Sequence, residues 1–228
     1  MGREDLKARI ERIKQYDVFN FSESQTKKSI IEPIFNCLGW DTSNPYEVQL
    51  EYVATPSRDR VDYALINGHT PLVLVEAKKA GQSLNNPDYF SQLLRYAFQK
   101  GTPLAILSNG INWWFYLPLQ EGDWQTRKFD SIDLNTQDID SVCDRFTKFL
   151  SKDSVTSGTA VERAKKMRQS RERVAKTRQI LPKAWEGIVA EPNEILVQVL
   201  TEETEKRCGF RPDIIQVKNF IREKAKSV

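Results

Sequence analysis

The chain has 228 residues, of which 39% are hydrophobic and 29% charged, a composition that suits one substantial globular domain with an appended segment. No apolar run approaches the ~20 residues of a membrane span, and the charged start lacks the apolar core of a secretory signal, so we expect a soluble, cytoplasmic protein. The formal net charge is only +3, but the positive charge is concentrated near the C-terminal end.

The N-terminal part of the chain predicts two helices and an outer strand. Apolar residues at helical spacing predict the first helix over 4–19. Ser22 is expected to cap a second helix, over 22–38, that ends at Gly39. Residues 48–53 alternate in polarity as an outer strand does, and a polar connection over 55–60 follows.

Residues 61–78 predict a central β-hairpin, because two apolar runs flank an Asn-Gly pair. The second run, Leu72–Val75, is apolar without alternation, which predicts a strand buried on both faces. Glu76 and Lys78 then share one side of the strand, and Asp62 on the neighbouring strand approaches them. Charges are costly at the edge of a core, so this group predicts a hard-cation site; an ordinary salt bridge at a strand end is the alternative.

The middle of the chain adds a helix, a second hairpin and a closing helix. The helix is expected over 87–100, with Pro87 at its first position and Gly101 just past its end. The hairpin spans 103–117, and its aromatic return strand is expected to belong to the core rather than to stack on bases. An edge strand over 124–129 and a helix over 139–150 complete the predicted domain.

A stretch rich in Ser, Thr and Gly over 151–159 predicts a domain boundary. The expected organisation is a domain over 1–151, a linker over 152–159 and a helical C-terminal region over 160–228. That region begins with a basic helix, which Pro182 is expected to break, and continues with helices over 195–206 and 214–226.

The segment 160–183 carries nine Lys or Arg against two Glu, a net charge of +7 that leaves −4 for the rest of the chain. Such a helix predicts sequence-independent contact with a nucleic-acid backbone. A solvated helix, an interdomain strut or a dimer contact is the alternative, and the interrupted apolar stripe argues against a coiled coil. The residues expected to contact phosphates are Arg163, Lys165, Lys166, Arg168, Arg171, Arg173, Lys176 and Arg178.

The cysteine and histidine content narrows the chemistry. Cys37, Cys143 and Cys208 are few and far apart, which predicts buried thiols in a reducing compartment rather than disulfides or a zinc site. The only histidine, His69, lies in the expected hairpin turn, which argues against Ser-His or Cys-His nucleophilic catalysis.

Gln92 and Tyr96 are four residues apart, so they share one face of the helix after the hairpin. With Asp62 on one strand and Glu76-Ala-Lys78 ending the next, this pattern resembles the PD-(D/E)xK nuclease superfamily in its RecB-like branch with a Gln-x-x-x-Tyr motif. The nearest likeness is to the N-terminal nuclease domain of type I restriction enzyme R subunits, over about residues 20–117. Val61 stands where the superfamily's motif has Pro, as in many of its members.

The superfamily also places an acidic residue on the first core helix, for which Glu23 and Glu32 are candidates. Glu23 is preferred because it opens a segment that ends in Leu-Gly-Trp-Asp, as in the restriction subunits. Glu32 is expected to be solvated. The chain has no Gly-x-x-x-x-Gly-Lys-[Ser/Thr] phosphate loop, so we expect a stand-alone relative without ATP-driven translocation.

The resemblance implies an α/β, restriction-endonuclease-like fold in which helices flank a mixed sheet, with an α-helical C-terminal extension. It also implies a Mg²⁺-dependent endonuclease that acts on DNA, with Mn²⁺ as a substitute metal. Its implied catalytic residues are Asp62, Glu76, Lys78, Gln92, Tyr96 and Glu23, and its implied metal ligands are Asp62, Glu76 and the carbonyl of Ala77.

Two functions of other classes fit the same residues. A non-catalytic module would keep the nuclease fold and use the basic helix to bind nucleic acid or a partner protein. A structural assembly subunit would form a homo-oligomer through its C-terminal helices. Intact Asp, Glu and Lys at the three motif positions favour the enzyme over both.

Overall fold

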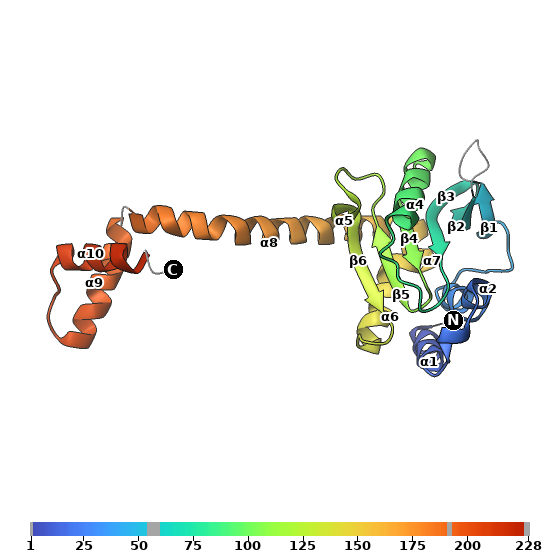
Figure 1. Cartoon of the computed structure of the whole chain (residues 1–228), viewed down its shortest axis with the longest axis horizontal. Coiled ribbons are helices and arrows are strands. Elements are labelled where there is room, and N and C mark those ends of the chain that lie inside the picture. Colours follow the sequence, from blue (N-terminus) through green and yellow to red (C-terminus); the bar gives the residue numbers. More distant parts are fainter. Residues whose placement is uncertain (1, 54–59, 191–192, 226–228) are drawn as a thin grey trace. The chain divides into compact units, whose positions relative to one another are not determined.

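The computed structural model describes residues 2–53, 60–190 and 193–225, and the chain divides into two compact units, Met1–Arg168 and Gln169–Val228. The first unit is built on a six-stranded sheet with the strand order β1-β2-β3-β4-β5-β6 (Figure 1). Neighbouring strands pair antiparallel except for β3 and β4, which are parallel, so the sheet is mixed as predicted. The strands are β1 (Val48–Val53), β2 (Arg60–Asn67), β3 (Thr70–Ala77), β4 (Leu104–Ser108), β5 (Asn112–Tyr116) and β6 (Lys128–Asp133).

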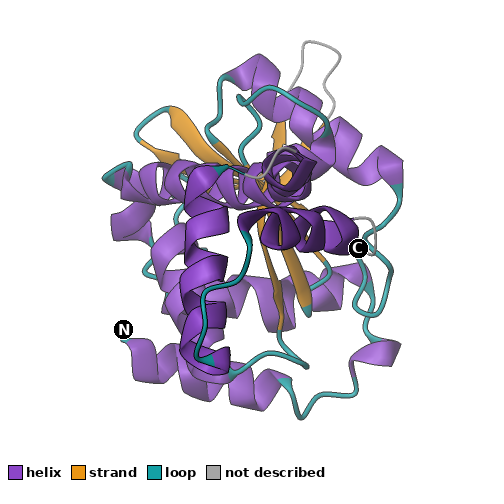
Figure 2. Ribbon diagram, turned by 90° about the vertical axis from the view of Figure 1, so that its left-hand side faces the viewer, coloured by secondary structure: helices purple, strands orange, loops and turns teal. Residues whose placement is uncertain are grey.

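Helices pack against both faces of this sheet (Figure 2). One face carries a core cluster with residues from α1, α3 and α6, together with the sheet residues Tyr63, Val73 and Val75. The other carries α4 and the short helix α5, packed on Ala64 and Leu74. The elements of the first layer are α1 (Arg3–Ile13), η1 (Val18–Asn20), α2 (Glu23–Thr26), η2 (Lys27–Ile31), α3 (Glu32–Cys37), α6 (Ile139–Leu150) and α7 (Lys152–Thr156); those of the second are α4 (Pro87–Lys100) and α5 (Trp124–Arg127). The α/β class with a helix-flanked mixed sheet is thus confirmed.

The central hairpin forms as predicted, apart from the position of its tip and a register shift between Leu65 and Ile66. Asn67 pairs with Thr70, so the two turn residues are Gly68 and His69, one position later than the Asn-Gly pair. Gly68 has a φ of 63°, a left-handed conformation that glycine adopts without strain. The centre of β3 has no exposed side-chain surface, as the unbroken apolar run predicted.

Near the N-terminus the first of the two predicted helices is shorter than expected. The first ends at Ile13 instead of position 19, and a 3₁₀ turn, η1, follows. The second begins and ends as predicted, with Ser22 as its cap and Gly39 at a φ of 91°. Its middle is the π-helical segment η2, which comes directly before Glu32-Pro33. Pro33 has no N–H to donate to the preceding turn, and the hydrogen-bond ladder widens just before it.

Later elements of the first unit agree with the expected ranges, apart from the last strand. Helices α4 and α6 have the predicted bounds. The segment 124–129, expected as a strand, begins instead with α5, because the side chain of Asp123 accepts a hydrogen bond from Thr126 N at 2.8 Å and starts a helical turn. The edge strand β6 therefore begins at Lys128. The expected connection 55–60 lies, except for its last residue, outside the described residues.

The expected linker over 152–159 is wrong. Ser151 caps α7 there, and Val155 is 4% exposed within the first core cluster. The next helix, α8 (Thr159–Ala190), contributes Ala160 and Ala164 to the same cluster, so the first unit extends to Arg168. The stretch is rich in Ser, Thr and Gly because it holds the caps and the turn between two helices.

The second unit continues α8 and adds α9 (Glu194–Cys208) and α10 (Ile214–Ala225). Pro182 lies inside α8, which continues to Ala190, so the expected break is wrong; a proline removes one helical hydrogen bond, and the turns on either side hold. The two predicted C-terminal helices are confirmed, with Lys226 outside the described residues. A small core cluster joins the three helices through Val189, Val197, Val217 and Ile221.

The three cysteines are all free, as expected, and burial raises the pKa of the Cys37 and Cys143 thiols. Cys208 is exposed at the end of α9, which corrects the expectation that it is buried. None of the helices described here is both long and apolar enough to span a membrane.

Candidate functional site

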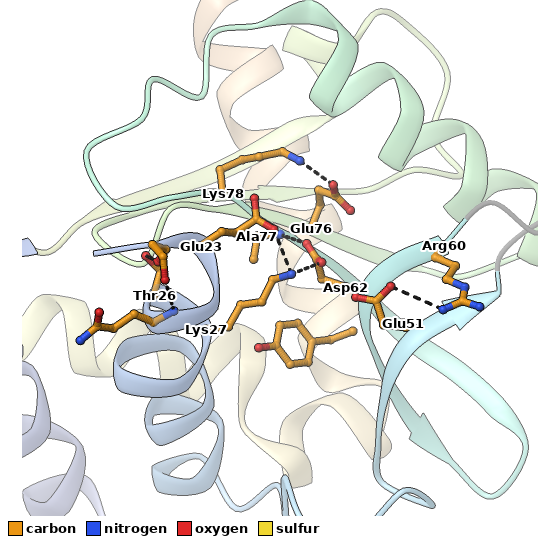
Figure 3. Close-up of polar contacts among 12 residues, drawn as sticks. Glu23, Thr26, Lys27, Glu51, Arg60, Asp62, Glu76, Ala77 and Lys78 are labelled. Atoms are coloured by element: carbon orange, nitrogen blue, oxygen red, sulfur yellow. Dashed lines mark hydrogen bonds and ion pairs between the residues drawn. The ribbon is translucent and has the colours of Figure 1, made fainter. Parts of the chain in front are cut away.

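Two carboxylates lie side by side where β2 begins and β3 ends (Figure 3). Extending the Tyr63–Val75 pairing by one residue places Asp62 opposite Glu76. The Oδ2 atom of Asp62 accepts a hydrogen bond from Ala77 N at 2.7 Å, which fixes the carboxylate at the end of the ladder. Burial raises the pKa of Glu76, and the negative charge of Asp62 raises it further.

Each carboxylate has an ammonium partner. Lys78 Nζ lies 2.7 Å from Glu76 Oε1, so the two side chains share one side of the strand end as the i, i+2 spacing predicted. Lys27, at the start of η2, forms an ion pair with Asp62 Oδ1 and lies 3.1 Å from Glu23 Oε1. Burial is the largest single effect and lowers the pKa of Lys27, but the hydrogen bonds and negative charges of Asp62 and Glu23 together outweigh it, so the pKa is raised.

The two candidate helix acids lie in different surroundings. Glu23 is in the first turn of α2, and its carboxylate reaches the site through Lys27. Glu32 is buried rather than solvated, which corrects the expectation; its Oε1 accepts from the Tyr63 hydroxyl at 3.2 Å and its Oε2 lies 2.9 Å from Lys28 Nζ. Of the two, Glu23 is the one whose ion-pair partner, Lys27, also pairs with Asp62.

Gln92 and Tyr96 share one face of α4, as their spacing predicted. Gln92 Nε2 donates to the Tyr96 hydroxyl at 2.9 Å, and Tyr96 is 2% exposed in the core beneath the helix. Within the described part of the chain, no hydrogen bond or ion pair joins either side chain to Asp62 or Glu76. Gln92 and Tyr96 therefore contact each other, and among the described residues no hydrogen bond links them directly to the carboxylate pair.

Three further residues lie at the site and were not predicted from the sequence: Thr26, Lys27 and Tyr89. Lys27 holds Asp62, and the buried Thr26 beside it accepts a hydrogen bond from Ala80 N at 2.9 Å. Tyr89 places its ring 4.7 Å from Lys78 Nζ and accepts from Gln82 Nε2 at 2.6 Å. A signal existed for Tyr89, since it precedes Gln92 and Tyr96 by three and seven residues on the same helix face.

The donors gathered here are oxygens. Among the described residues there is no cluster of three or more His, Cys, Asp or Glu side chains arranged to hold a metal. The carboxylates of Asp62 and Glu76 supply oxygen donors, and the backbone of Ala77 lies between them and Lys78. Carboxylate oxygens are the donors that hard cations take in proteins, with water or substrate as the remaining ligands.

The basic helix, residues 160–183 of α8, has residues in both units. Arg163, Lys165 and Lys166 are exposed on the part of α8 that belongs to the first unit. Arg168 donates from Nη1 to Gln120 Oε1 at 3.2 Å and from Nη2 to the Glu121 carbonyl at 3.3 Å, so it anchors the helix to the first unit. The remaining predicted phosphate contacts are exposed in the second unit: Arg171, Arg173, Lys176 and Arg178.

The raised pKa of Glu76 leads to a testable stability effect. The folded protein holds the Glu76 proton more tightly than the unfolded chain does, so ionising Glu76 lowers the free energy of unfolding as pH rises above the ordinary value of 4.5. Glu76→Gln keeps the neutral form, and we expect it to raise the melting temperature of the metal-free protein at pH 7 by on the order of a few degrees.

The gain from Glu76→Gln should vanish below pH 4.5, where the wild-type carboxyl is also neutral. Thermal unfolding of both proteins at several pH values measures this, with the exposed Glu11→Gln as the control for a lost surface charge. A variant less stable than the wild type at pH 7 would show that the ion pair with Lys78 outweighs the burial of Glu76.

Comparison with known proteins identifies one part of the chain. Residues 49–124 match the family model of the type I restriction enzyme R protein N terminus. No curated protein and no solved structure matches the chain. The matched segment is a third of the 228 residues and contains Asp62, Glu76, Lys78, Gln92 and Tyr96. Glu23, Lys27 and the basic helix lie outside it. Over this third of its length the chain is similar to the type I restriction enzyme R protein N terminus, and its helix-flanked mixed sheet is consistent with a nuclease-like domain of that kind.

Proposed function

We propose that this site hydrolyses phosphodiester bonds of DNA with Mg²⁺ as its metal. The observation that carries the proposal is the grouping of Asp62, Glu76 and Lys78 at adjoining ends of β2 and β3. All three lie within the segment that matches a restriction-enzyme family, and DNA is the substrate of restriction enzymes. The charges there are partly buried, and buried charge is costly unless it is paired or binds a cation.

The donor set fits Mg²⁺. This ion is bound in proteins through one or two carboxylates, with water and substrate phosphate completing its octahedral shell. Asp62 and Glu76 would supply the carboxylates and the carbonyl of Ala77 a third oxygen. Burial raises the pKa of Glu76 and the charge of Asp62 raises it further, so a cation between the two carboxylates would relieve their repulsion. Mn²⁺ accepts the same donors and would substitute.

The chain's own residues divide the remaining work. When bound, Mg²⁺ supplies Lewis-acid polarisation of the phosphate and lowers the pKa of a water ligand. Lys78 would direct its ammonium protons at the attacking water or at the charge developing on the phosphate oxygens. Tyr89 faces that ammonium and would limit its movement. Gln92, held by the Tyr96 hydroxyl, would orient substrate beside the site.

A second candidate is a non-catalytic module that retains the fold and binds DNA or a partner protein. One observation favours it: Asp62 and Glu76 are each already paired with a lysine, which satisfies their charge without a metal. The two candidates differ in a property that is simple to measure, because only the enzyme requires a divalent cation for an effect on DNA.

The decisive experiment incubates the full chain with linear, nicked, supercoiled and single-stranded DNA in Mg²⁺, in Mn²⁺ and in EDTA. We expect cleavage with either metal and none in EDTA. Asp62→Asn should lower the rate by about 10³-fold, because it removes a charged metal ligand. Glu11→Gln, an exposed substitution on α1 that is not part of the candidate site, should leave the rate unchanged.

Binding of DNA without cleavage under all metal conditions would favour the non-catalytic module. Cleavage by Asp62→Asn at the wild-type rate would remove Asp62 from the site.

A further inference from the structure

Lys27 occupies the position of a cation at Asp62. One oxygen of that carboxylate, Oδ2, is taken by Ala77 N, and the other, Oδ1, is paired with the Lys27 ammonium. The side chains of Lys27 and Asp62 are 18% and 12% exposed, so solvent screens the pair weakly. Figure 3 shows Lys27 reaching from its helix toward the start of β2, with Glu23 beside it.

The chain holds Lys27 there through its neighbour. Thr26 is fully buried, and its hydroxyl donates to the Ser22 carbonyl at 3.0 Å and accepts from Ala80 N at 2.9 Å. These bonds tie the helix to the segment just after Lys78. Gly110 packs closely on the same turn, because a Cβ added there would lie 3.0 Å from Thr26 Cγ2. Lys27 then begins the π-helical segment η2, an irregularity frequent at functional sites.

Glu23 gives the same ammonium a second partner. Its Oε1 lies 3.1 Å from Lys27 Nζ, one helical turn before it, and its side chain is 44% exposed. When a divalent cation binds Asp62, Lys27 therefore keeps its ion pair with Glu23, and its charge is not left unpaired.

Building on the proposed function, we propose that Lys27 is a positioning residue that competes with the divalent cation for Asp62. In the metal-free protein its ammonium holds the carboxylate in place, and on metal binding it shifts to Glu23. The structure thus assigns Glu23 the role of receiving the displaced ammonium.

Competition predicts opposite effects of two substitutions on metal affinity. Lys27→Met removes a unit charge that opposes the cation, and the affinity for Mn²⁺ or Mg²⁺ should rise roughly tenfold. Lys27→Arg keeps the charge and should stay near the wild type. Glu23→Gln leaves Lys27 in place but removes its second partner, so metal affinity should fall roughly three- to tenfold.

The measurement is a calorimetric titration of the full-length protein with Mn²⁺ and with Mg²⁺, in the absence of DNA. Lys28→Met is the matched control, because its ammonium is adjacent in sequence but pairs with Glu32 instead of Asp62. Melting temperatures with and without metal add a second readout: Lys27→Met should be less stable than the wild type without metal and gain more from it.

Metal affinity that is unchanged or lower in Lys27→Met would overturn the proposal, as would unchanged affinity in Glu23→Gln. The second variant keeps the Lys27–Asp62 pair and decides the matter if Lys27→Met does not fold. If neither the wild-type protein nor any variant binds metal, the proposed function is overturned instead. The two failures are therefore distinguishable.

Discussion

Replacing Lys78 with Met is expected to lower DNA cleavage by about 10²–10³-fold while metal binding persists. The ammonium lies 2.7 Å from Glu76 and would act on the water or the phosphate rather than on the ion. Its removal leaves both carboxylates able to bind a cation, and metal affinity should equal or exceed that of the wild type, because Lys78 no longer neutralises Glu76. Loss of catalysis without loss of metal is the signature of a group that stabilises the transition state.

Single-turnover cleavage at saturating Mg²⁺, together with a metal titration, separates the two effects of Lys78→Met. Lys79→Met is the matched control, since it removes an exposed ammonium from the next position. A Lys78→Met protein that cuts DNA at the wild-type rate would reduce Lys78 to a salt-bridge partner of Glu76. A protein that loses both metal and cleavage would show instead that Lys78 supports the shape of the strand end.

Part of the site could be predicted from sequence because it depends on a short-range rule: residue parity puts Glu76 and Lys78 on one side of β3. The position of Asp62 opposite Glu76 depends in addition on a register shift between Leu65 and Ile66, without which the pairing of Asn67 with Thr70 would place Asp62 opposite Val75. Lys27 obeys no such rule. Its contact with Asp62 joins residues 35 positions apart and depends on how the helix approaches the sheet. Only the i, i+4 spacing of Glu23 and Lys27 was visible in the sequence, and it is common on helix surfaces.

Composition predicted a linker wrongly where polar residues serve as helix caps. The Ser- and Thr-rich stretch after α6 suggested a linker, but Ser151 caps α7 and Val155 and Ala160 fill the core. Its only sequence signal of burial was a few small apolar residues separated by turns. Glu32 misled in the opposite sense: as a charged residue before a proline it suggested solvent, yet the Tyr63 hydroxyl satisfies it inside the fold. A single sequence does not reveal such partners because they come from another element.

The basic helix leads to the other large effect, on DNA affinity. Because Ala160 and Ala164 belong to the core of the first unit, truncation near residue 159 would damage that unit, so substitutions in the full chain are the sharper test. Changing Arg173, Lys176, Arg178 and Lys183 to Gln removes four exposed cations from α8. If all four contact phosphates, the slope of log K against log salt should become shallower by about 3.6, at ~0.9 per contact.

DNA affinity near physiological salt should then fall by roughly 10²–10³-fold, whatever the DNA sequence. The matched control changes Lys206, Arg207, Arg211 and Arg222 to Gln, which removes the same charge from exposed positions of the second unit outside α8. Binding measured at three salt concentrations for the three proteins separates a local contact from a general effect of net charge. Equal slopes in all three would exclude phosphate contact by these four residues. The exposed Val174, Leu181 and Trp185 of α8 would then point to a protein surface as its partner, because apolar side chains of this size are depleted on faces that only meet solvent.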